Sequence, residues 1–216
     1  DISSNQMTGS IPEDIGNLIN LKHLNLNGTL NNIAFEGENG GEIPESITQL
    51  TNLEFLSLDA NELIGQIPNG IGNLIKLKTL GLSYNFLNGS IPEGIYTLDS
   101  LLSLSFEGND LTGSISASIG NLDSLIEFFA GDNNLNGTIP SSIGNLENLT
   151  YFRIAGNNLT GQIPIQLYNC TNLFYLDVSN NELFGTISPL IGNLTNLNDL
   201  RLSGNAFSWL IPEEFC

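Results

Sequence analysis

The sequence predicts an α/β repeat solenoid, in which short parallel strands from successive units stack into one sheet over a continuous core. The main observation is an asparagine with a period of 24 residues, followed four residues later by glycine and six residues later by isoleucine. Apolar residues also stand five and three positions before each asparagine. A register kept this strictly is typical of repeat architectures. The asparagines are Asn61, Asn85, Asn109, Asn133, Asn157, Asn181 and Asn205.

The apolar pairs predict the strands. In Leu80/Leu82 and Phe152/Ile154 the spacing of two places both side chains on one face of an extended strand. A unit with one short strand cannot bury that face alone, so neighbouring units must stack. About eight such strands, at roughly 4.8 Å each, would give a sheet about 40 Å wide.

The recurring asparagine predicts a buried ladder. A turn inside a coil leaves backbone donors and acceptors unpaired, and an Asn amide satisfies both kinds. We therefore expect the asparagines to form a column of hydrogen bonds along the stack.

The residues that follow each asparagine carry a family resemblance. Leu-x-Gly-x-Ile-Pro occurs at 63–68 and 159–164, and Ile-Gly-Asn-Leu at 71–74. With Leu-x-x-Leu-x-Leu-x-x-Asn-x-Leu, these motifs resemble plant-type leucine-rich repeats. The resemblance implies a right-handed superhelix with a concave parallel β-sheet, a second short strand near each Gly-x-Ile-Pro, and 3₁₀ turns and loops on the convex side. Ser116 and Ser188 depart from the pattern, because proline is usual at these positions.

We expect residues 1–216 to form a single domain of about nine units, with the first and last truncated. An insertion within 28–42, rich in Gly, Asn and Glu, interrupts the second unit. It is either a tolerated surface loop or a small recognition loop. Solenoids need end caps, and no cysteine-paired cap is visible, so we interpret the chain as a fragment of a longer array.

The charge balance disfavours several partners. The chain has 23 acidic and 5 basic residues, a formal net charge of −18. Contacts to phosphate require Lys and Arg, so nucleic acid and anionic membrane surfaces are poor partners. No apolar run is long enough to span a membrane, so we expect no direct membrane insertion of this segment.

The sequence offers little for catalysis. Its only histidine, His23, falls on an outward-facing strand position with no second histidine or reactive cysteine in register, and triads and zinc sites need such partners. Glu107, Glu127 and Asp132 form either a solvated face or a group that gathers a cation. Cys170 replaces a core leucine and should be buried. We predict a non-enzymatic protein with no cofactor.

Two outward-facing columns predict where a ligand binds. Counted back from each asparagine, the positions four and six residues earlier converge on aromatic and arginine side chains, which are enriched at binding hot spots. A structural alternative is that Arg153, Asp177 and Arg201 form a cross-strand charge ladder and that Arg153 stacks on Phe129. The predicted ligand-binding residues are Phe129, Tyr151, Arg153, Tyr175, Asp177 and Arg201.

The resemblance extends to function. It is strongest to ectodomains of receptor-like kinases and receptor-like proteins, which implies an extracellular module that binds a protein or peptide, with a co-receptor as a further partner. Such ectodomains often hold a peptide carboxylate with Arg-x-Arg on one strand, whereas here the strands read 151–153 Tyr-Phe-Arg and 201–203 Arg-Leu-Ser. That mode of peptide recognition is therefore not expected.

Two alternatives stay open. A polygalacturonase-inhibitor-like protein would bind a cell-wall-degrading glycosidase, and an acidic face would suit a basic enzyme. An ice-binding protein would use the row of hydroxyl and amide side chains that includes Thr112, Ser114, Asn136 and Thr138. Sequons are weak evidence for secretion. The possible N-glycosylation sites are Asn27, Asn88, Asn136, Asn148, Asn158, Asn169 and Asn193.

Overall fold

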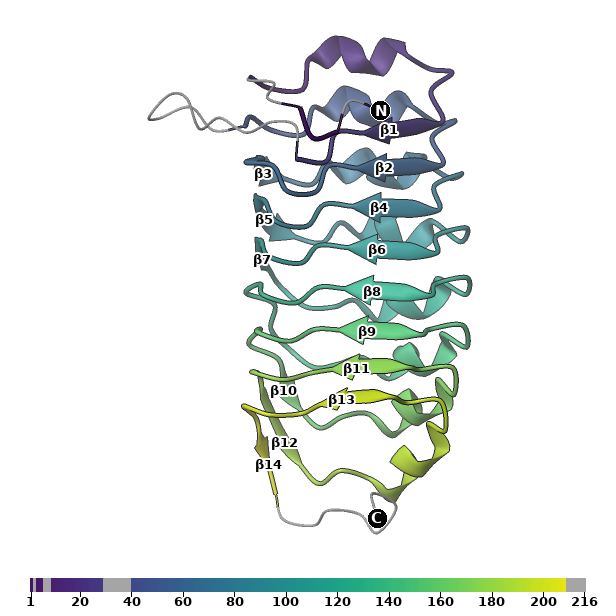
Figure 1. Cartoon of the computed structure of the whole chain (residues 1–216), viewed down its shortest axis with the longest axis vertical. Coiled ribbons are helices and arrows are strands. Elements are labelled where there is room, and N and C mark those ends of the chain that lie inside the picture. Colours follow the sequence, from purple (N-terminus) through teal and green to yellow (C-terminus); the bar gives the residue numbers. More distant parts are fainter. Residues whose placement is uncertain (2, 6–8, 29–39, 209–216) are drawn as a thin grey trace.

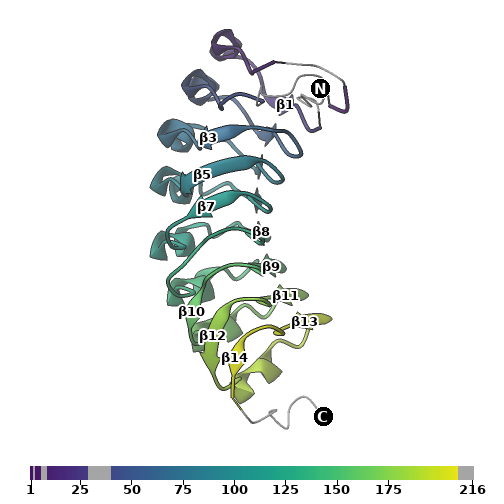
Figure 2. The same cartoon turned by 90° about the vertical axis from the view of Figure 1, so that its left-hand side faces the viewer.

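The computed structural model describes residues 1–216 except 2, 6–8, 29–39 and 209–216, and shows a curved stack of coils (Figures 1 and 2). Most of the predicted insertion within 28–42 lies outside the described residues, as does Cys216. Within the described part, eight parallel strands form one continuous sheet on the inner side of the curve. In order they are β1 (His23–Asn25), β2 (Phe55–Ser57), β4 (Thr79–Gly81), β6 (Ser103–Ser105), β8 (Glu127–Phe129), β9 (Tyr151–Arg153), β11 (Tyr175–Asp177) and β13 (Asp199–Arg201).

Shorter strands, which we call the flank strands, form a second set beside the Gly-x-Ile-Pro segments. One sheet comprises β3 (Ile64–Gln66), β5 (Phe86–Ser90) and β7 (Asp110–Thr112), and another comprises β10 (Thr160–Gly161), β12 (Glu182–Gly185) and β14 (Ala206–Phe207). Isolated bridges continue the pairing between the two sheets, as in Ser114 with Asn136 and Thr138 with Thr160. The second strand implied by the resemblance is thus confirmed, although some units reduce it to a single bridge.

Short 3₁₀ helices lie on the outer side of the curve (Figure 2). Each is preceded by an extended residue, usually the proline of Gly-x-Ile-Pro, whose fixed φ suits this position. At the two positions without proline, the Oγ atoms of Ser116 and Ser188 accept hydrogen bonds from the amides of Ser118 and Leu190, both at 3.2 Å. The helices are η1 (Glu13–Asn17), η2 (Glu45–Gln49), η3 (Asn69–Asn73), η4 (Glu93–Thr97), η5 (Ala117–Asn121), η6 (Ser141–Asn145), η7 (Ile165–Asn169) and η8 (Pro189–Asn193).

The core lies between the two sides and runs the length of the stack. The middle residues of the long sheet pair in register, as Leu104 with Phe128 and Phe152 with Leu176, and all four side chains are buried. A fully buried side chain of this size contributes about 1.5–3 kcal/mol. Cys170 is also buried, as predicted, and its Sγ donates to the carbonyl of Ile143 at 3.2 Å.

The asparagine ladder is confirmed. Asn109 donates through Nδ2 to the carbonyl oxygens of Phe106 in its own coil (2.8 Å) and Leu82 in the preceding coil (3.0 Å). Its Oδ1 accepts from the amide of Leu87 at 2.9 Å. Equivalent bonds recur along the stack, as at Asn157. Each amide therefore joins two neighbouring coils through hydrogen bonds to both.

Candidate functional site

The long sheet brings the six predicted binding residues together on its concave face. In β8, β9, β11 and β13, Phe129, Arg153, Asp177 and Arg201 form one column, and Tyr151 and Tyr175 lie side by side in the next. Their strands are neighbours in Figure 1. We call this set (Phe129, Tyr151, Arg153, Tyr175, Asp177, Arg201) the concave patch.

Arg153 is held by three carboxylates. Its guanidinium nitrogens lie 2.5 Å from Oε1 of Glu107, 3.0 Å from Oδ2 of Asp132 and 3.5 Å from Oδ2 of Asp177. Only 22% of the side chain is exposed. Burial on its own would lower the pKa of Arg153, but the hydrogen bond to Asp132 and the charge of Glu107 outweigh it and raise the pKa. Arg153 is therefore a fixed, charged part of the concave floor.

Asp177 supports this arrangement from below. Its side chain is 3% exposed, and its Oδ1 accepts from the hydroxyl (2.6 Å) and the amide (3.0 Å) of Ser179. The hydroxyl of Tyr175 donates to Oδ2 at 3.2 Å. Burial, together with the charge of Asp177, raises the pKa of Tyr175. Asp177 is thus a buried support for its neighbours and presents no free carboxylate to a ligand.

Arg201 differs from Arg153 because it remains exposed. Its side chain is 54% exposed and pairs with Asp199 on the same strand at 2.8 Å. Its Cζ lies 5.2 Å from the centre of the Tyr175 ring, a cation–π arrangement. The charge ladder predicted as an alternative is correct for the Arg153–Asp177 pair, but Arg201 pairs with Asp199. The described cation–π contact is likewise that of Arg201 with Tyr175 and not the expected stacking of Arg153 on Phe129.

One aromatic residue that was not predicted, Phe174, lies beside the concave patch. The ring centres of Phe129 and Tyr151 are 6.4 Å apart, and those of Tyr151 and Phe174 are 6.0 Å apart, both within the range of favourable aromatic pairs. Phe174 stands directly before β11, outside the alternation used to list outward-facing strand residues. It was missed because that alternation ends where the strand begins.

Two further residues around Arg153, Gly131 and Tyr84, were also missed. A Cβ at Gly131 would lie 2.5 Å from Nη1 of Arg153, so the glycine makes room for the guanidinium. Tyr84 donates its hydroxyl to Glu107 at 2.8 Å, and this bond raises the pKa of Tyr84. Tyr84 (φ 56°) and Asp132 (φ 52°) occupy the left-handed region, where equivalent coils have Gly108 and Gly156. For a bulky residue that conformation is unusual.

Two of the three carboxylates expected to gather a cation already face one. Glu107 and Asp132 contact Arg153, and Glu127 accepts a hydrogen bond from the hydroxyl of Ser103 at 2.7 Å. Across the described ranges no group of three or more His, Cys, Asp and Glu side chains could hold a metal ion. The guanidinium of Arg153 is therefore the cation that Glu107 and Asp132 contact.

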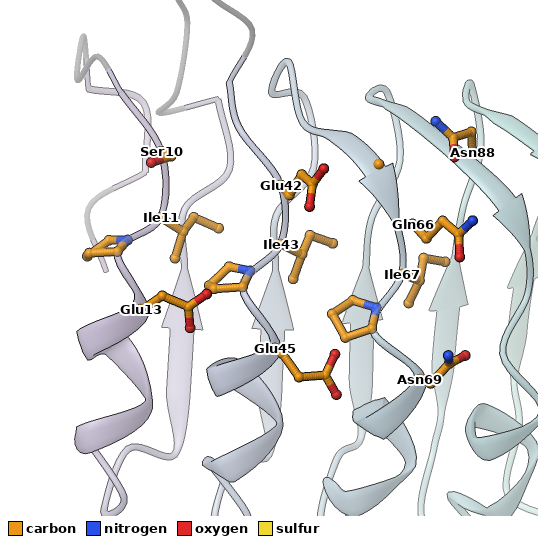
Figure 3. Close-up of a pocket in the computed structure, with 14 residues that line it drawn as sticks. Ser10, Ile11, Glu13, Glu42, Ile43, Glu45, Gln66, Ile67, Asn69 and Asn88 are labelled. Carbon is orange, nitrogen blue, oxygen red and sulfur yellow. The ribbon is translucent and has the colours of Figure 1, made fainter.

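A separate groove of about 810 Å³ lies on the flank of the first coils, beside the Ile-Pro segments (Figure 3). Glu13, Glu42 and Glu45 line it, and the stacked Ile11, Ile43 and Ile67 lie behind its opening. The sequence did not predict this groove. It is far in the stack from the concave patch, which begins at β8.

The sequon asparagines lie mainly away from the concave sheet. The six from Asn88 onward are exposed and belong to the flank strands, the turns or the last residue of a 3₁₀ helix. Asn148 uses its Nδ2 to donate to the carbonyl of Asp123 at 2.9 Å. None of these six positions lies on a strand of the long sheet. The described part of the chain also contains no helix long and apolar enough to cross a membrane.

Comparison with known proteins bears on this architecture. The Leucine Rich Repeat family model matches residues 1–18, 52–74, 76–98, 100–122, 124–146, 148–170, 172–194 and 196–216. No curated protein sequence matches the chain.

Solved plant receptor structures match over the whole chain. It is 35% identical to a structure of the Arabidopsis receptor kinase HAESA in complex with the peptide hormone IDA and the co-receptor SERK1, with a TM-score of 0.90 over 100% of this chain and 35% of that chain. It is 33% identical to the plant peptide hormone receptor RGFR1 in complex with RGF2, with a TM-score of 0.82 over 99% of this chain and 37% of that chain. The chain thus spans little more than a third of these receptor structures.

A plant ice-binding protein is also similar, at 28% identity and a TM-score of 0.71, over 96% of this chain and 72% of that chain. The repeat register, the parallel sheet and these matches agree. The chain belongs to the leucine-rich-repeat family, and its repeats are of the kind found in plant receptor ectodomains.

Proposed function

We propose that this chain is a non-catalytic, extracellular recognition module that binds a peptide, or an extended segment of a protein, across its concave patch. The observation that carries the proposal is the gathering of aromatic and arginine side chains on β8, β9, β11 and β13. Similarity to receptor structures that contain peptide hormones supports the ligand class. A co-receptor as a second partner is part of the proposal, because the HAESA structure includes one.

The patch is suited to binding because its floor is already ordered. Arg153 and Asp177 are fixed by their ion pair and by Ser179, so little side-chain freedom is lost there when a ligand docks. Phe129 and Tyr151 supply rigid aromatic surface, and aromatic residues are typical of binding hot spots. Arg201 is exposed and is the arginine available to an acidic group of the ligand.

The test begins with a peptide selected from a displayed random library against the wild-type chain and titrated by calorimetry. We expect Tyr151→Ala to weaken binding at least about tenfold, because it removes a central aromatic contact. Arg201→Ala should weaken the binding of an acidic peptide by a similar factor. Phe86→Ala is the matched control, since Phe86 is an exposed aromatic residue on the flank strand β5.

If both concave variants bind the peptide with unchanged affinity and Phe86→Ala weakens binding instead, recognition lies on the flank and the proposal is refuted. Circular dichroism of each variant confirms that the stack remains folded. A library that yields no binder to the wild type, but does yield binders to a receptor ectodomain handled in parallel, would equally refute it.

Ice binding is a second candidate, favoured by the similarity to a plant ice-binding protein. Thr112 and Asn136 are exposed on the flank that carries β7, and Asn136 pairs with Ser114 in a bridge that aligns the row. Thermal hysteresis of the purified chain tests this function. Hysteresis that disappears in Thr112→Leu and Thr138→Leu would support it, and its absence in the wild type would exclude it.

A further inference from the structure

A second candidate surface lies at the N-terminal ends of the strands of the long sheet. It is formed by the residue directly before each strand. Backbone hydrogen bonds link these residues from coil to coil, as from the amide of Leu102 to Lys78 and from the amide of Ile126 to Leu102, both at 2.8 Å. They therefore form a column with the strand spacing of about 5 Å. The column is Lys22, Glu54, Lys78, Leu102, Ile126, Thr150, Phe174 and Asn198.

The chemistry of this column changes along the stack. Its first part is a charge ladder, in which Glu54 lies 3.7 Å from Lys22 and 2.9 Å from Lys78. Its second part exposes Leu102 (38%), Ile126 (37%) and Phe174 (41%). We call these three residues the edge strip. Polar and charged residues occupy the remaining positions of the column, so folding does not require an apolar side chain directly before the strand.

Exposed carboxylates lie in the turns beside the edge strip, and one of them, Asp99, accepts a hydrogen bond from the hydroxyl of Ser100 at 3.2 Å. Asp99, Asp123 and Glu147 are exposed in the turns that precede β6, β8 and β9. The turns stack on one another, since Nδ2 of Asn148 donates to the carbonyl of Asp123 at 2.9 Å. None of the three carboxylates forms an ion pair with any residue that the structure describes. An apolar strip beside exposed carboxylates that form no ion pair is complementary to a segment whose apolar side chains are flanked by cations.

We propose that the edge strip docks a partner segment in which aliphatic or aromatic side chains alternate with Lys or Arg. This surface is distinct from the concave patch, although Tyr151 contacts Phe174 and so lies between the two. A second copy of this chain is a poor occupant, because two molecules with a formal net charge of −18 repel one another.

The test uses three fluorescent peptides of equal length: Lys alternating with Leu and Phe, Glu alternating with the same apolar residues, and Lys alternating with Ser. Fluorescence anisotropy measures their binding to the full chain. We expect the first peptide to bind at least about tenfold more tightly than the other two, because only it satisfies both the strip and its acidic border. Added salt should weaken its binding.

Variants of the chain locate the binding. Leu102→Asn combined with Ile126→Asn, which alters the edge strip away from Tyr151, should weaken binding of the first peptide at least about tenfold. The matched control combines Ile165→Asn with Leu190→Asn, which replaces two exposed aliphatic residues on the 3₁₀ helices η7 and η8, away from the long sheet, and should bind like the wild type. Arg201→Ala should also bind normally, which separates this surface from the concave patch.

Several results would overturn the proposal. Equal binding of the Lys/Ser peptide would reduce the effect to charge attraction, and equal binding of the Glu peptide would remove the role of the acidic border. An affinity that survives the strip variant would place the site elsewhere. A wild-type dimer in light scattering that the strip variant converts to a monomer would identify a second copy as the occupant instead.

Discussion

The two arginines of the concave patch occupy the same register position, and their surroundings decide what each can do. Arg153 lies over Gly131 and contacts three carboxylates, whereas Arg201 extends over a tyrosine ring with more than half of its side chain exposed. The first arginine has little charge left to offer a ligand. The second pairs with one exposed carboxylate, and such a pair is weak in water and easily exchanged.

We expect Arg153→Met to lower the free energy of unfolding by about 1–3 kcal/mol, because it leaves Glu107 and the buried Asp177 without their cation. Arg201→Met should leave it nearly unchanged, because this arginine belongs to an exposed ion pair. Urea denaturation followed by circular dichroism measures both. Equal effects would show that the three-carboxylate cluster contributes no more than an exposed pair.

The Cys170 thiol gives a pH dependence. Burial raises its pKa from 9.0 to about 12, so the unfolded chain releases this proton at a lower pH than the folded one. Stability from this group is complete below pH 9 and is lost as the pH rises toward 12, by up to about 1.4 kcal/mol per pH unit. Denaturation between pH 9 and 10 should show this slope, and Cys170→Ala should reduce it. An identical slope in the variant would contradict the assignment.

At the scale of the elements, the structure depends on how each coil is closed. The asparagine amide supplies one donor group and one acceptor at the turn after the strands of the long sheet from β2 onward, as at Asn109. The residue before it adopts a left-handed conformation, as Gly108 and Gly156 do. The period of 24 residues predicted the ladder because buried backbone groups require partners. It did not predict Tyr84 and Asp132 at the left-handed position, since no spacing rule reveals backbone strain.

Replacing Asn109 should therefore be costly. We expect Asn109→Ala to lower the free energy of unfolding by about 2–4 kcal/mol, because the amide of Leu87 and two carbonyl groups lose their partner in a buried site. The matched control is Asn134→Ala, at an exposed neighbouring position, with an expected change of about 0.5 kcal/mol or less. Similar losses in the two variants would mean that the ladder does not join the coils.

For the whole molecule, the repeat register allowed the fold to be predicted almost completely. Once the strands were in register, the columns followed, and with them the grouping of Phe129, Arg153, Asp177 and Arg201. The register gives which side chains share a face but not how far each one reaches. For that reason the pairing of Arg153 with Glu107, two strands away, and the apolar edge at Phe174 could be found only in the structure.

The net charge of −18 also acts at this scale. It favours cationic partners over the entire surface, so affinity alone cannot locate a site. If the ligand binds the concave face, protection from hydrogen exchange should be confined to the strands that carry the concave patch. A ligand attracted only by charge would instead be spread over the turns and the flank groove that contains Glu13 and Glu45.

The most direct measurement is hydrogen exchange of the full chain with and without a peptide selected against it. We predict that the peptide slows exchange in β8, β9, β11 and β13 and leaves the flank strands β5 and β7 unchanged. Protection confined to β5 and β7, or spread evenly over the chain, would contradict the assignment of ligand binding to the concave patch.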